Sequence, residues 1–403
     1  MSELFRELNL SVTAPRGFRA GAIASGIKSD TAIKDLAMLA SDVPCTVAGT
    51  FTTSATRAAP VLVCQERLKQ GQGQAVIVNS GNANCANGAT GLRNAYRMTE
   101  LAAQRLGLKP ELVLCSSTGI IGRQLPMDKI EAGVQRIELS QEYGLDFVEG
   151  IMTTDTRPKY QALEFTIEGK TVRLAGATKG AGMIYPNMAT MLCYLTTDAA
   201  ISHDWLQREL RVAVDESFNM IAIDGDMSTN DTCLLFANGM AGNTPINEQH
   251  PEAGTFRAAL RHITRYLARE MARDGEGATK LMTVHVRGAR DKADAVKAAR
   301  SVTLSPLWQC AVAGEDPNWG RIVAALGSSG CALNQGAFDV FLGDVQVVSK
   351  GEAAHYEQQQ AKAVMKQDEI IITVDLHLGS DQATAWGCDL THGYIDENTQ
   401  YER

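Results

Sequence analysis

The sequence lacks a positive charge excess, a long apolar run and a recognisable leader. Its 403 residues carry 38 basic and 46 acidic side chains, a formal net charge of −8. The basic side chains are scattered rather than striped, so no nucleic-acid partner is expected. No apolar run is long enough to span a bilayer, so no membrane partner is expected. The N-terminal stretch has two glutamates and no apolar segment flanked by basic residues, unlike a signal peptide.

Patterns typical of metal sites are also absent from the sequence. There is no CxxC motif and no pair of histidines at helical spacing, so no metal site is expected. The stretch 224–231 begins like a calcium loop, but Thr229 and Leu235 occupy the positions that need glycine and glutamate. The nine cysteines are widely spaced, odd in number and mostly embedded in apolar stretches. This usage predicts a reduced, cytoplasmic protein.

The apolar pattern predicts a globular protein that mixes helices and strands. Apolar residues make up 45% and charged residues 21% of the chain. Runs at 75–78, 112–115 and 283–286 are typical of strands, whereas 92–106 and 256–271 have the three-and-four apolar spacing of amphipathic helices. We therefore predict the α/β or α+β class, as a layered sandwich of sheets flanked by helices.

The C-terminal part of the sequence predicts a further strand and a second lobe. Residues 369–378 alternate, with apolar side chains from Ile370 to Leu378 on one face, which indicates a strand with one wet face. The loop 274–280 follows a long predicted helix and is a candidate junction, with a second lobe at 281–403.

The segment 179–192, KGAGMIYPNMATML, has the residue types of a self-processing site. Its glycines and proline indicate an irregular loop, and 190–196 then alternates like a strand, so Thr190 is expected where a loop enters a sheet. A threonine hydroxyl needs a base, and an N-terminal threonine carries one as its own α-amine. Thr190 is internal, so the bond between Ala189 and Thr190 must first be cut. The alternative is that Thr190 merely begins an ordinary strand.

Seven further motifs accompany this segment and carry a family resemblance. They are VNSGNANC (78–85), SSTGIIG (116–122), MTTDT (152–156), DGDMSTNDT (224–232), DGEGATK (274–280), GEDPNWGRI (314–322) and AWGCDLTHGY (385–394). Together they span most of the chain. The sequence resembles the ornithine acetyltransferase (glutamate N-acetyltransferase) family, whose members carry KG(S/A)GMI-x-PNMATML and cleave before the threonine.

The resemblance implies specific site residues. Thr190 would be the nucleophile, and the Thr118 hydroxyl and Gly119 N–H would form the oxyanion hole. The substrate pocket would be lined by Thr153, Lys179, Thr190, Glu276 and Asn398. Lys179 would pair with an amino-acid carboxylate and Glu276 with a substrate ammonium. Taken singly, Thr118 and Gly119 also fit a strand-end turn, and Lys179 and Glu276 fit solvated loop positions.

The resemblance also implies a reaction and an assembly. Thr190 would take the acetyl group of N-acetylornithine and pass it to glutamate in arginine biosynthesis, with no cofactor or metal. Use of acetyl-CoA as a donor is left open. Cleavage would give fragments 1–189 and 190–403, interwoven and assembled as a heterotetramer of two copies of each. The sequence departs from the family at its end, where Arg403 replaces the usual Thr or Ser.

Four other functions are considered as alternatives. A conventional acetyl-CoA-dependent acetyltransferase is disfavoured because QGQGQA at 70–75 precedes a predicted strand instead of opening a helix, and reads as a flexible turn. A self-cleaving amidase or aminopeptidase of similar fold, or a transferase with an altered amino-acid substrate, would use the same nucleophile. A non-catalytic binding protein would stay in one piece.

Overall fold

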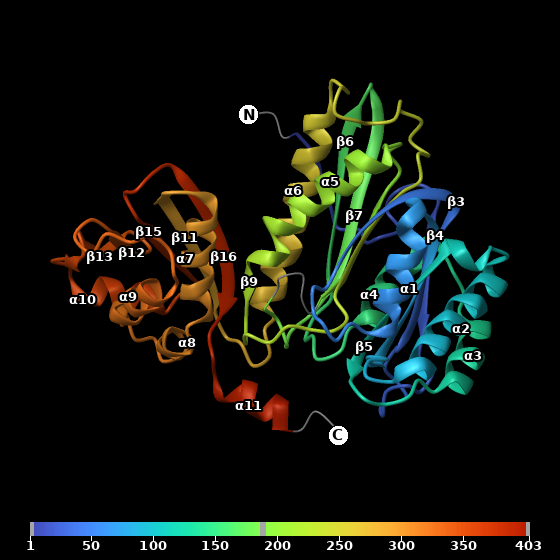
Figure 1. Cartoon of the computed structure of the whole chain (residues 1–403), viewed down its shortest axis with the longest axis horizontal. Helices are drawn as coiled ribbons and strands as arrows, with labels where there is room; N and C mark the ends of the chain where they lie inside the picture. Colours follow the sequence, from blue (N-terminus) through green and yellow to red (C-terminus); the bar gives the residue numbers. More distant parts are fainter. Residues whose placement is uncertain (1–3, 186–190, 400–403) are drawn as a thin grey trace. The chain divides into compact units, whose positions relative to one another are not determined.

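The computed structural model describes residues 4–185 and 191–399, and Figure 1 shows its elements along the chain. The chain divides into two compact units. The first comprises Met1–Gly180, Asn187–Asp215 and Met227–Leu267, and the second comprises Ala181–Pro186, Glu216–Asp226 and Ala268–Arg403. Each unit contains one sheet with helices, so the predicted α/β class is confirmed.

A nine-stranded sheet forms the centre of the first unit. In spatial order its strands are β1 (Arg6–Leu8), β6 (Lys159–Ile167), β7 (Lys170–Lys179), β8 (Leu192–Thr197), β10 (Thr232–Ala237), β3 (Leu36–Phe51), β4 (Gln72–Asn82) and β5 (Val113–Ile120), with β2 (Phe18–Ile23) paired to β3. The pairs β8–β10 and β4–β5 are parallel, and the others are antiparallel. The register places Leu192 beside Thr232 at the start of the first parallel pair.

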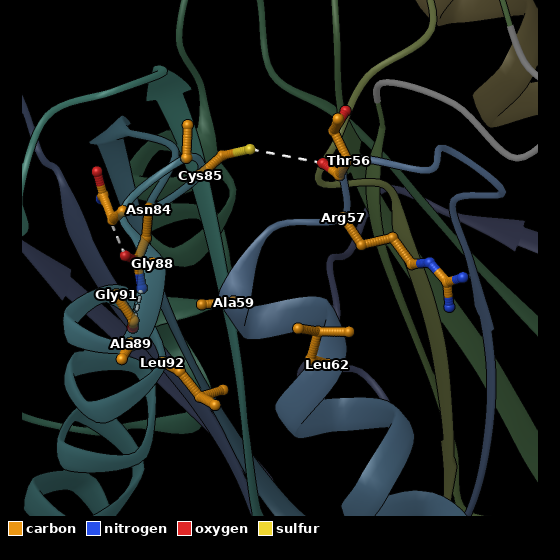
Figure 2. A pocket seen from close by; sticks show the side chains of 12 residues that line it. Thr56, Arg57, Ala59, Leu62, Asn84, Cys85, Gly88, Ala89, Gly91 and Leu92 are labelled. Carbon is orange, nitrogen blue, oxygen red and sulfur yellow. Dashed lines mark hydrogen bonds between the residues drawn. The ribbon is translucent and has the colours of Figure 1, made fainter.

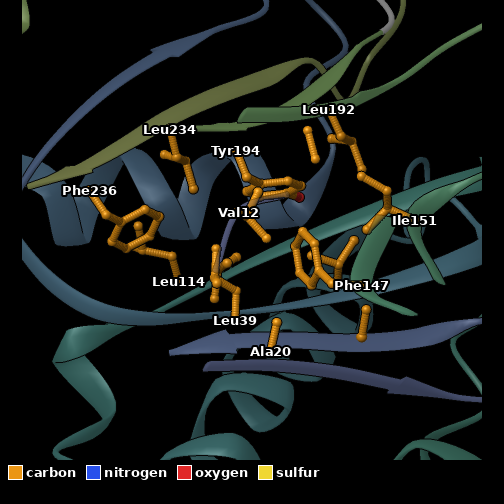
Figure 3. Packing of buried hydrophobic residues seen from close by; sticks show 14 of the residues in the cluster. Val12, Ala20, Leu39, Leu114, Phe147, Ile151, Leu192, Tyr194, Leu234 and Phe236 are labelled. Carbon is orange, nitrogen blue, oxygen red and sulfur yellow. The ribbon is translucent and has the colours of Figure 1, made fainter. Parts of the chain in front are cut away.

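Helices and two apolar clusters complete the first unit. The helices are α1 (Ala59–Arg67), α2 (Gly88–Leu106), α3 (Met127–Arg136), α4 (Gly144–Ile151), α5 (His203–Asp215) and the greater part of α6 (Ala253–Arg273), with short 3-10 turns at Leu68–Gln70, Pro110–Leu112 and Gln141–Tyr143. One cluster lies where α4 meets the sheet. There Phe147 packs edge-on against Tyr194, with 5.2 Å between the two ring centroids (Figure 3). The other joins α1, α2 and α3 to β4 and β5.

Most expected elements of the first unit are confirmed, with two corrections. The strands expected at 75–78 and 112–115 lie mainly in β4 and β5, and the helix at 92–106 lies in α2. The strand expected at 190–196 is β8, but all its side chains are buried because apolar clusters cover the sheet. The segment 70–75 is not a flexible turn: only Gly71 turns, with φ 63°, and β4 already begins at Gln72.

The second unit holds a seven-stranded sheet. Its strands in order are β14 (Glu352–Ala353), β13 (Val345–Ser349), β12 (Asp339–Leu342), β15 (Glu369–Asp375), β11 (Leu281–Ala289), β16 (Asp381–Cys388) and β9 (Ile221–Ala222). The helices are α7 (Lys292–Leu304), α8 (Pro306–Ala313), α9 (Trp319–Ser328), α10 (Gln358–Met365) and α11 (His392–Thr399), with a 3-10 turn at Phe218–Met220. In Figure 1, α7 lies along β11 and β16.

The strand expected at 369–378 is shorter than its pattern. It is β15, which ends at Asp375 and has one buried and one wetter face, as expected. Leu376 is buried beyond its end, but His377 has φ 52° and the chain turns, so Leu378 is 36% exposed. The strand expected at 283–286 is part of β11 and the helix at 256–271 is α6. Residues 274–280 and 281–403 both fall within the second unit.

None of the helices in the described ranges 4–185 and 191–399 is long and apolar enough to cross a membrane.

Candidate functional site

Thr118 and Gly119 lie in the last residues of β5, beside the end of β4. Thr118 is buried, and Gly119 has φ +130°, a conformation that favours glycine. A Cβ on Gly119 would lie 2.3 Å from the carbonyl carbon of Gly81, so no other residue fits without moving β4. The strand end expected for an oxyanion hole is therefore present, and its glycine is required by close packing.

Buried amides fix this strand end. The Asn230 side chain donates to the carbonyl oxygens of Ser117 at 2.8 Å and Ala83 at 2.6 Å. The Ser117 hydroxyl donates to Asn79 Oδ1 at 2.6 Å, and Asn79 donates to the Asn82 carbonyl at 2.8 Å. Buried hydrogen-bond networks whose members are paired make a unique, rigid geometry. The residue just before Thr118 is thus held by side chains of two neighbouring segments.

Lys179, at the end of β7, contacts two of the predicted site threonines. Its Nζ donates to Thr153 Oγ1 at 2.6 Å and to Thr118 Oγ1 at 3.2 Å. Lys179 is only 3% exposed, so the solvated-loop alternative for this residue is wrong. A buried ammonium keeps its charge only where it is paired or hydrogen-bonded. The structure therefore brings together three residues that lie far apart in the sequence.

Asp155 holds the backbone next to this cluster. Its Oδ1 accepts from Lys159 Nζ at 2.6 Å and from the Gly180 N–H at 2.7 Å, and its Oδ2 accepts from the Thr153 N–H at 2.9 Å. Burial raises the pKa of Asp155, but the ammonium groups of Lys159 and Lys179 outweigh burial and hold that pKa below its usual range. Asp155 is therefore a buried anion that fixes the backbone of Thr153 and of the residue after Lys179.

Lys28 adds a second cation near Lys179. Its Nζ donates to the carbonyl oxygens of Met152 at 2.8 Å and Lys34 at 3.0 Å. Burial lowers the pKa of Lys28 to about 8; Asp35 opposes that effect and the charge of Lys179 adds to it. The positive potential around Thr153 thus comes from more than one side chain, which favours a bound carboxylate.

Glu276 and Asn398 meet within the second unit. Asn398, near the end of α11, donates from Nδ2 to Glu276 Oε2 at 2.8 Å and to the Tyr394 carbonyl at 2.9 Å. Glu276 is 8% exposed, so its solvated-loop alternative is also wrong. These two predicted pocket residues are in contact, and they present a carboxylate with one amide partner.

Two glycines let the backbone approach Glu276 closely. A Cβ on Gly182 would lie 2.2 Å from Glu276 Oε2, and the Glu276 N–H donates to the Ala181 carbonyl at 3.0 Å. A Cβ on Gly277, whose φ is +68°, would lie 2.4 Å from the Gly393 carbonyl carbon. Glu276 is therefore enclosed by the KGAGMI loop and by the start of α11.

The same loop is held by Asp224, the first residue of the DGDMSTNDT motif. Asp224 Oδ2 accepts from the Met183 N–H at 2.5 Å and Oδ1 from the Ile184 N–H at 2.8 Å. Burial raises the pKa of Asp224 although these N–H groups oppose the shift. The Arg300 guanidinium lies over the Tyr185 ring at 4.3 Å. The chain from Met183 to Tyr185 is thus fixed by side chains.

A pocket of about 450 Å³ lies in the first unit, between the starts of α1 and α2 (Figure 2). Its lining includes Thr56, Arg57, Leu62, Asn84, Cys85 and Leu92. Cys85 Sγ contacts the Thr56 carbonyl at 3.6 Å across it. The Ala83 N–H and the Cys85 carbonyl bond to Ile120 and Gly122, so the pocket wall is continuous with the segment that follows Gly119. The pocket was not expected from the sequence.

The predicted site residues therefore fall into three groups. Thr118, Thr153 and Lys179 are in direct contact in the first unit, and Glu276 and Asn398 are in contact in the second. The predicted cleavage residues Ala189 and Thr190 lie outside the described residues, as does Arg403. In the ranges that are described, no group of three His, Cys, Asp or Glu side chains is placed to hold a metal ion.

Sequence reasoning missed Asp155, Lys28, Asn230 and Asp224 as members of the site. Three of them lie inside motifs that were singled out: Asp155 in MTTDT, and Asp224 and Asn230 in DGDMSTNDT. Their partners are backbone groups of distant residues, which no local pattern reveals. Lys28 lies outside every motif and carries no sequence signal.

Comparison with known proteins agrees with this geometry. The sequence model described as the ArgJ family matches residues 19–403. The chain belongs to the ArgJ family. The arginine biosynthesis bifunctional protein ArgJ of Symbiobacterium thermophilum is 50% identical over 393 residues, covering 97% of this chain and 98% of that protein. The ArgJ of Dehalococcoides mccartyi is 45% identical over 392 residues, covering 97% of each. The resemblance inferred from the motifs is confirmed.

A solved ArgJ structure resembles part of the chain. The crystal structure of the arginine biosynthesis bifunctional protein ArgJ from Bacillus halodurans is 40% identical, with a TM-score of 0.50. The match covers 51% of this chain and 96% of that chain, so the solved ArgJ chain is about half as long as this one.

Proposed function

We propose that this ArgJ-family chain is a glutamate N-acetyltransferase of arginine biosynthesis, which moves the acetyl group of N-acetylornithine to glutamate through an acetyl ester on Thr190. The observation that carries the proposal is the contact of Lys179 with both Thr118 and Thr153, because it joins a carboxylate-binding cation to the strand end that would hold an oxyanion. The family membership supports the same reaction.

The hydrogen bonding of Thr118 suits an oxyanion-hole donor. Its Oγ1 accepts from the Lys179 ammonium, so the hydroxyl hydrogen is not used in that contact and can point to a developing negative charge. Gly119, next to it, lacks a Cβ, so an acyl group can approach its N–H without a side chain in the way. Loss of one fixed oxyanion donor costs about 10²–10³ in rate.

The reaction proceeds in two balanced steps. The Thr190 oxygen bonds to the acetyl carbon, its hydroxyl proton passes to the Thr190 α-amine, and ornithine leaves after taking up that proton. The glutamate amine then attacks the ester and gives a proton to the Thr190 α-amine, the carbon–oxygen bond to Thr190 breaks, and the α-amine passes that proton to the threonine oxygen. Neither step needs a cofactor or a metal.

The charges of the site suit small amino acids. Lys179, with Lys28 nearby, offers positive charge to an α-carboxylate, and Asp155 holds the backbone beneath Thr153. Glu276, with Asn398 as its amide partner, offers negative charge to an ammonium group. N-acetylornithine and glutamate each carry a carboxylate, and ornithine carries a side-chain ammonium.

The nucleophile would be released by cleavage between Ala189 and Thr190. The Thr190 oxygen would attack the Ala189 carbonyl carbon, the carbon–nitrogen bond to Thr190 would break, and the hydroxyl proton would pass to the Thr190 nitrogen. Water would then hydrolyse the ester, giving fragments 1–189 and 190–403. The half-length solved chain of the Bacillus halodurans relative supports this processing. The fragments would assemble as a heterotetramer with two copies of each. We also propose a cytoplasmic location. The seven buried free thiols support it, because cysteines stay reduced in that compartment.

Acetyl-CoA is proposed as a second acetyl donor. The word "bifunctional" in the names of the relatives supports two activities on one chain. The same Thr190 ester would form, with a thiol as the leaving group. Release of free thiol on mixing acetyl-CoA and glutamate with the protein measures this activity directly.

The test is Thr190→Ala, compared with Thr171→Ala on the exposed part of β7. We expect the first variant to remain one full-length chain without transferase activity, whereas the control splits and turns over like the wild type. Mass spectrometry with N-acetylornithine alone should show an acetyl adduct on the C-terminal fragment of the wild type. If Thr190→Ala still splits at that bond or still transfers acetyl, the proposal is wrong.

A self-cleaving amidase and a transferase with another acceptor are separated by their products. With N-acetylornithine alone, an amidase releases acetate continuously, whereas the proposed enzyme stops after one acetyl group per site. Adding glutamate should then give N-acetylglutamate in amounts equal to the ornithine released. Another amino acid consumed in preference to glutamate would indicate the altered-substrate alternative.

A further inference from the structure

Asp231 is a buried carboxyl group whose position no step of the proposed reaction uses. It directly precedes β10 and is 0% exposed. Its Oδ1 accepts a hydrogen bond of 2.7 Å from the N–H of Met191, the residue that follows Thr190. The Met191 carbonyl oxygen accepts from the Thr232 N–H at 3.0 Å. The N–H and the carbonyl of Met191 are therefore bound by two consecutive residues, Asp231 and Thr232.

The second oxygen of Asp231 is not paired. Within residues 4–185 and 191–399, Oδ2 has no hydrogen-bond partner although it is buried. Burial raises the pKa of Asp231 well above its usual range, against the opposing effects of the Met191 N–H and the Lys179 charge.

A half-satisfied buried acid is a poor choice for stability alone. A buried polar atom without a partner costs free energy that one hydrogen bond does not return in full. A buried unpaired group needs an explanation, and a role in a reaction is one such explanation. The backbone of Asp231 is in addition well anchored, since its carbonyl accepts from the Thr52 N–H at 3.1 Å. The backbone of Asp231 is thus fixed, and its carboxyl group accepts from the Met191 amide and has the Thr52 side chain as a further neighbour.

We infer that Asp231 is a positioning residue for Thr190, acting through the N–H of Met191. The inference rests on the proposed function of Thr190 and adds the group that orients it. Asp231 holds the amide nitrogen directly bonded to the Thr190 carbonyl carbon, and so restricts rotation of the peptide unit that carries the nucleophile. Because a misplacement of about 1 Å at a reacting centre can cost about a hundredfold in rate, such a contact affects both cleavage and acetyl transfer.

The experiment compares Asp231→Asn, Asp231→Ala and a matched control, Asp198→Ala. Asp198 directly follows the other end of β8, is also buried, and accepts the Arg173 N–H at 2.8 Å. All proteins are made by cell-free synthesis, and the appearance of the two fragments is followed by mass spectrometry. Thermal unfolding is measured on each, and kcat and KM are measured on the cleaved protein.

We expect Asp231→Asn to cleave within about threefold of the wild type, because an amide oxygen still accepts from Met191. Asp231→Ala should cleave about tenfold to a hundredfold more slowly and lose kcat with little change in KM. Asp198→Ala should lose a similar amount of thermal stability but cleave normally. If Asp231 had a purely structural role, two variants that lose similar thermal stability should cleave at similar rates.

Three outcomes overturn the inference. The first is a folded Asp231→Ala that cleaves and turns over at the wild-type rate, and the second is an Asp198→Ala variant that is slowed as much. The third is a folded Asp231→Asn variant that cleaves about tenfold or more slowly than the wild type. This result argues against the acceptor role, and it can be obtained even if Asp231→Ala does not fold. Thr190→Ala is run alongside: if it splits, the proposed function fails, whatever the Asp231 variants do.

Discussion

The proposed carboxylate-binding cation of the first unit and the proposed ammonium-binding anion of the second unit are held in different ways. Lys179 ends a strand inside the nine-stranded sheet, and its ammonium contacts two hydroxyl groups above a buried aspartate. Glu276 lies on a loop of the second unit, and its side-chain partner is an amide on α11. The cation is therefore part of a rigid network, whereas the anion depends on a short helix without buried residues.

This difference suggests a division of labour. An α-carboxylate is common to N-acetylornithine and glutamate, and recognition of such a constant group suits a rigid cation. Ornithine and glutamate differ in their side chains. Recognition of the ornithine side chain can therefore be assigned to Glu276, a carboxylate held by a helix that makes few contacts. Substitutions at the cation are expected to affect both half-reactions, and substitutions at the anion mainly the one that involves ornithine.

The largest effect is expected from Lys179→Met, which removes the ammonium and keeps the length of the side chain. KM should rise about a hundredfold for both N-acetylornithine and glutamate, because a charged hydrogen-bond partner of the substrate is lost. Steady-state kinetics with each substrate varied in turn measures the change. Lys170→Met, at the exposed beginning of the same strand, is the control and should behave as the wild type. A rise for one substrate alone would contradict a shared carboxylate site.

A smaller and selective effect is expected from Glu276→Ala. Cleavage should be complete, while kcat/KM for N-acetylornithine should fall about tenfold and that for glutamate should change little, because only ornithine offers an ammonium side chain. Gel analysis and kinetics on one preparation report both properties. Glu352→Ala, an exposed carboxylate on β14, is the control. Unaltered turnover of N-acetylornithine would remove Glu276 from the site.

The smallest effect is expected from Asn398→Ala. It removes one neutral donor from Glu276 and leaves the carboxylate in place, so KM for N-acetylornithine should rise about threefold. Glu397→Ala, its neighbour on the exposed helix α11, is the control. An effect as large as that of Glu276→Ala would show that the helix, rather than the carboxylate, recognises the substrate.

The sequence predicted the strongly periodic elements better than the irregular ones. Helices α2 and α6 and strand β15 follow apolar spacing, whereas Leu378 continues the alternation after the chain has turned at His377. Periodicity records which side chains are apolar but not where a positive φ ends a strand. At 70–75 the glutamines and glycines predicted a turn where the structure has the start of a strand. From Gln72 onward these residues form part of β4 because they pair with β3, although they are not apolar.

Candidate site residues were predicted by resemblance, and their supports were not. General tendencies place Lys179 and Glu276 in solvent, yet both are buried because Thr153, Thr118 and Asn398 satisfy them. Asp155 and Asp231 each bind backbone N–H groups that lie between 2 and 40 positions away. Such contacts depend on how strands are paired across the sheet, and no spacing within one motif encodes them.

If the backbone is severed after Ala189, as proposed, the strand order has a practical consequence. Strand β8 from the C-terminal piece lies between β7 of the N-terminal piece and its own companion β10, and β10 in turn pairs with β3 of the N-terminal piece. Two seams of main-chain hydrogen bonds thus replace the lost covalent link. Dilution or gel filtration should leave the halves together, and a denaturant should be required to part them.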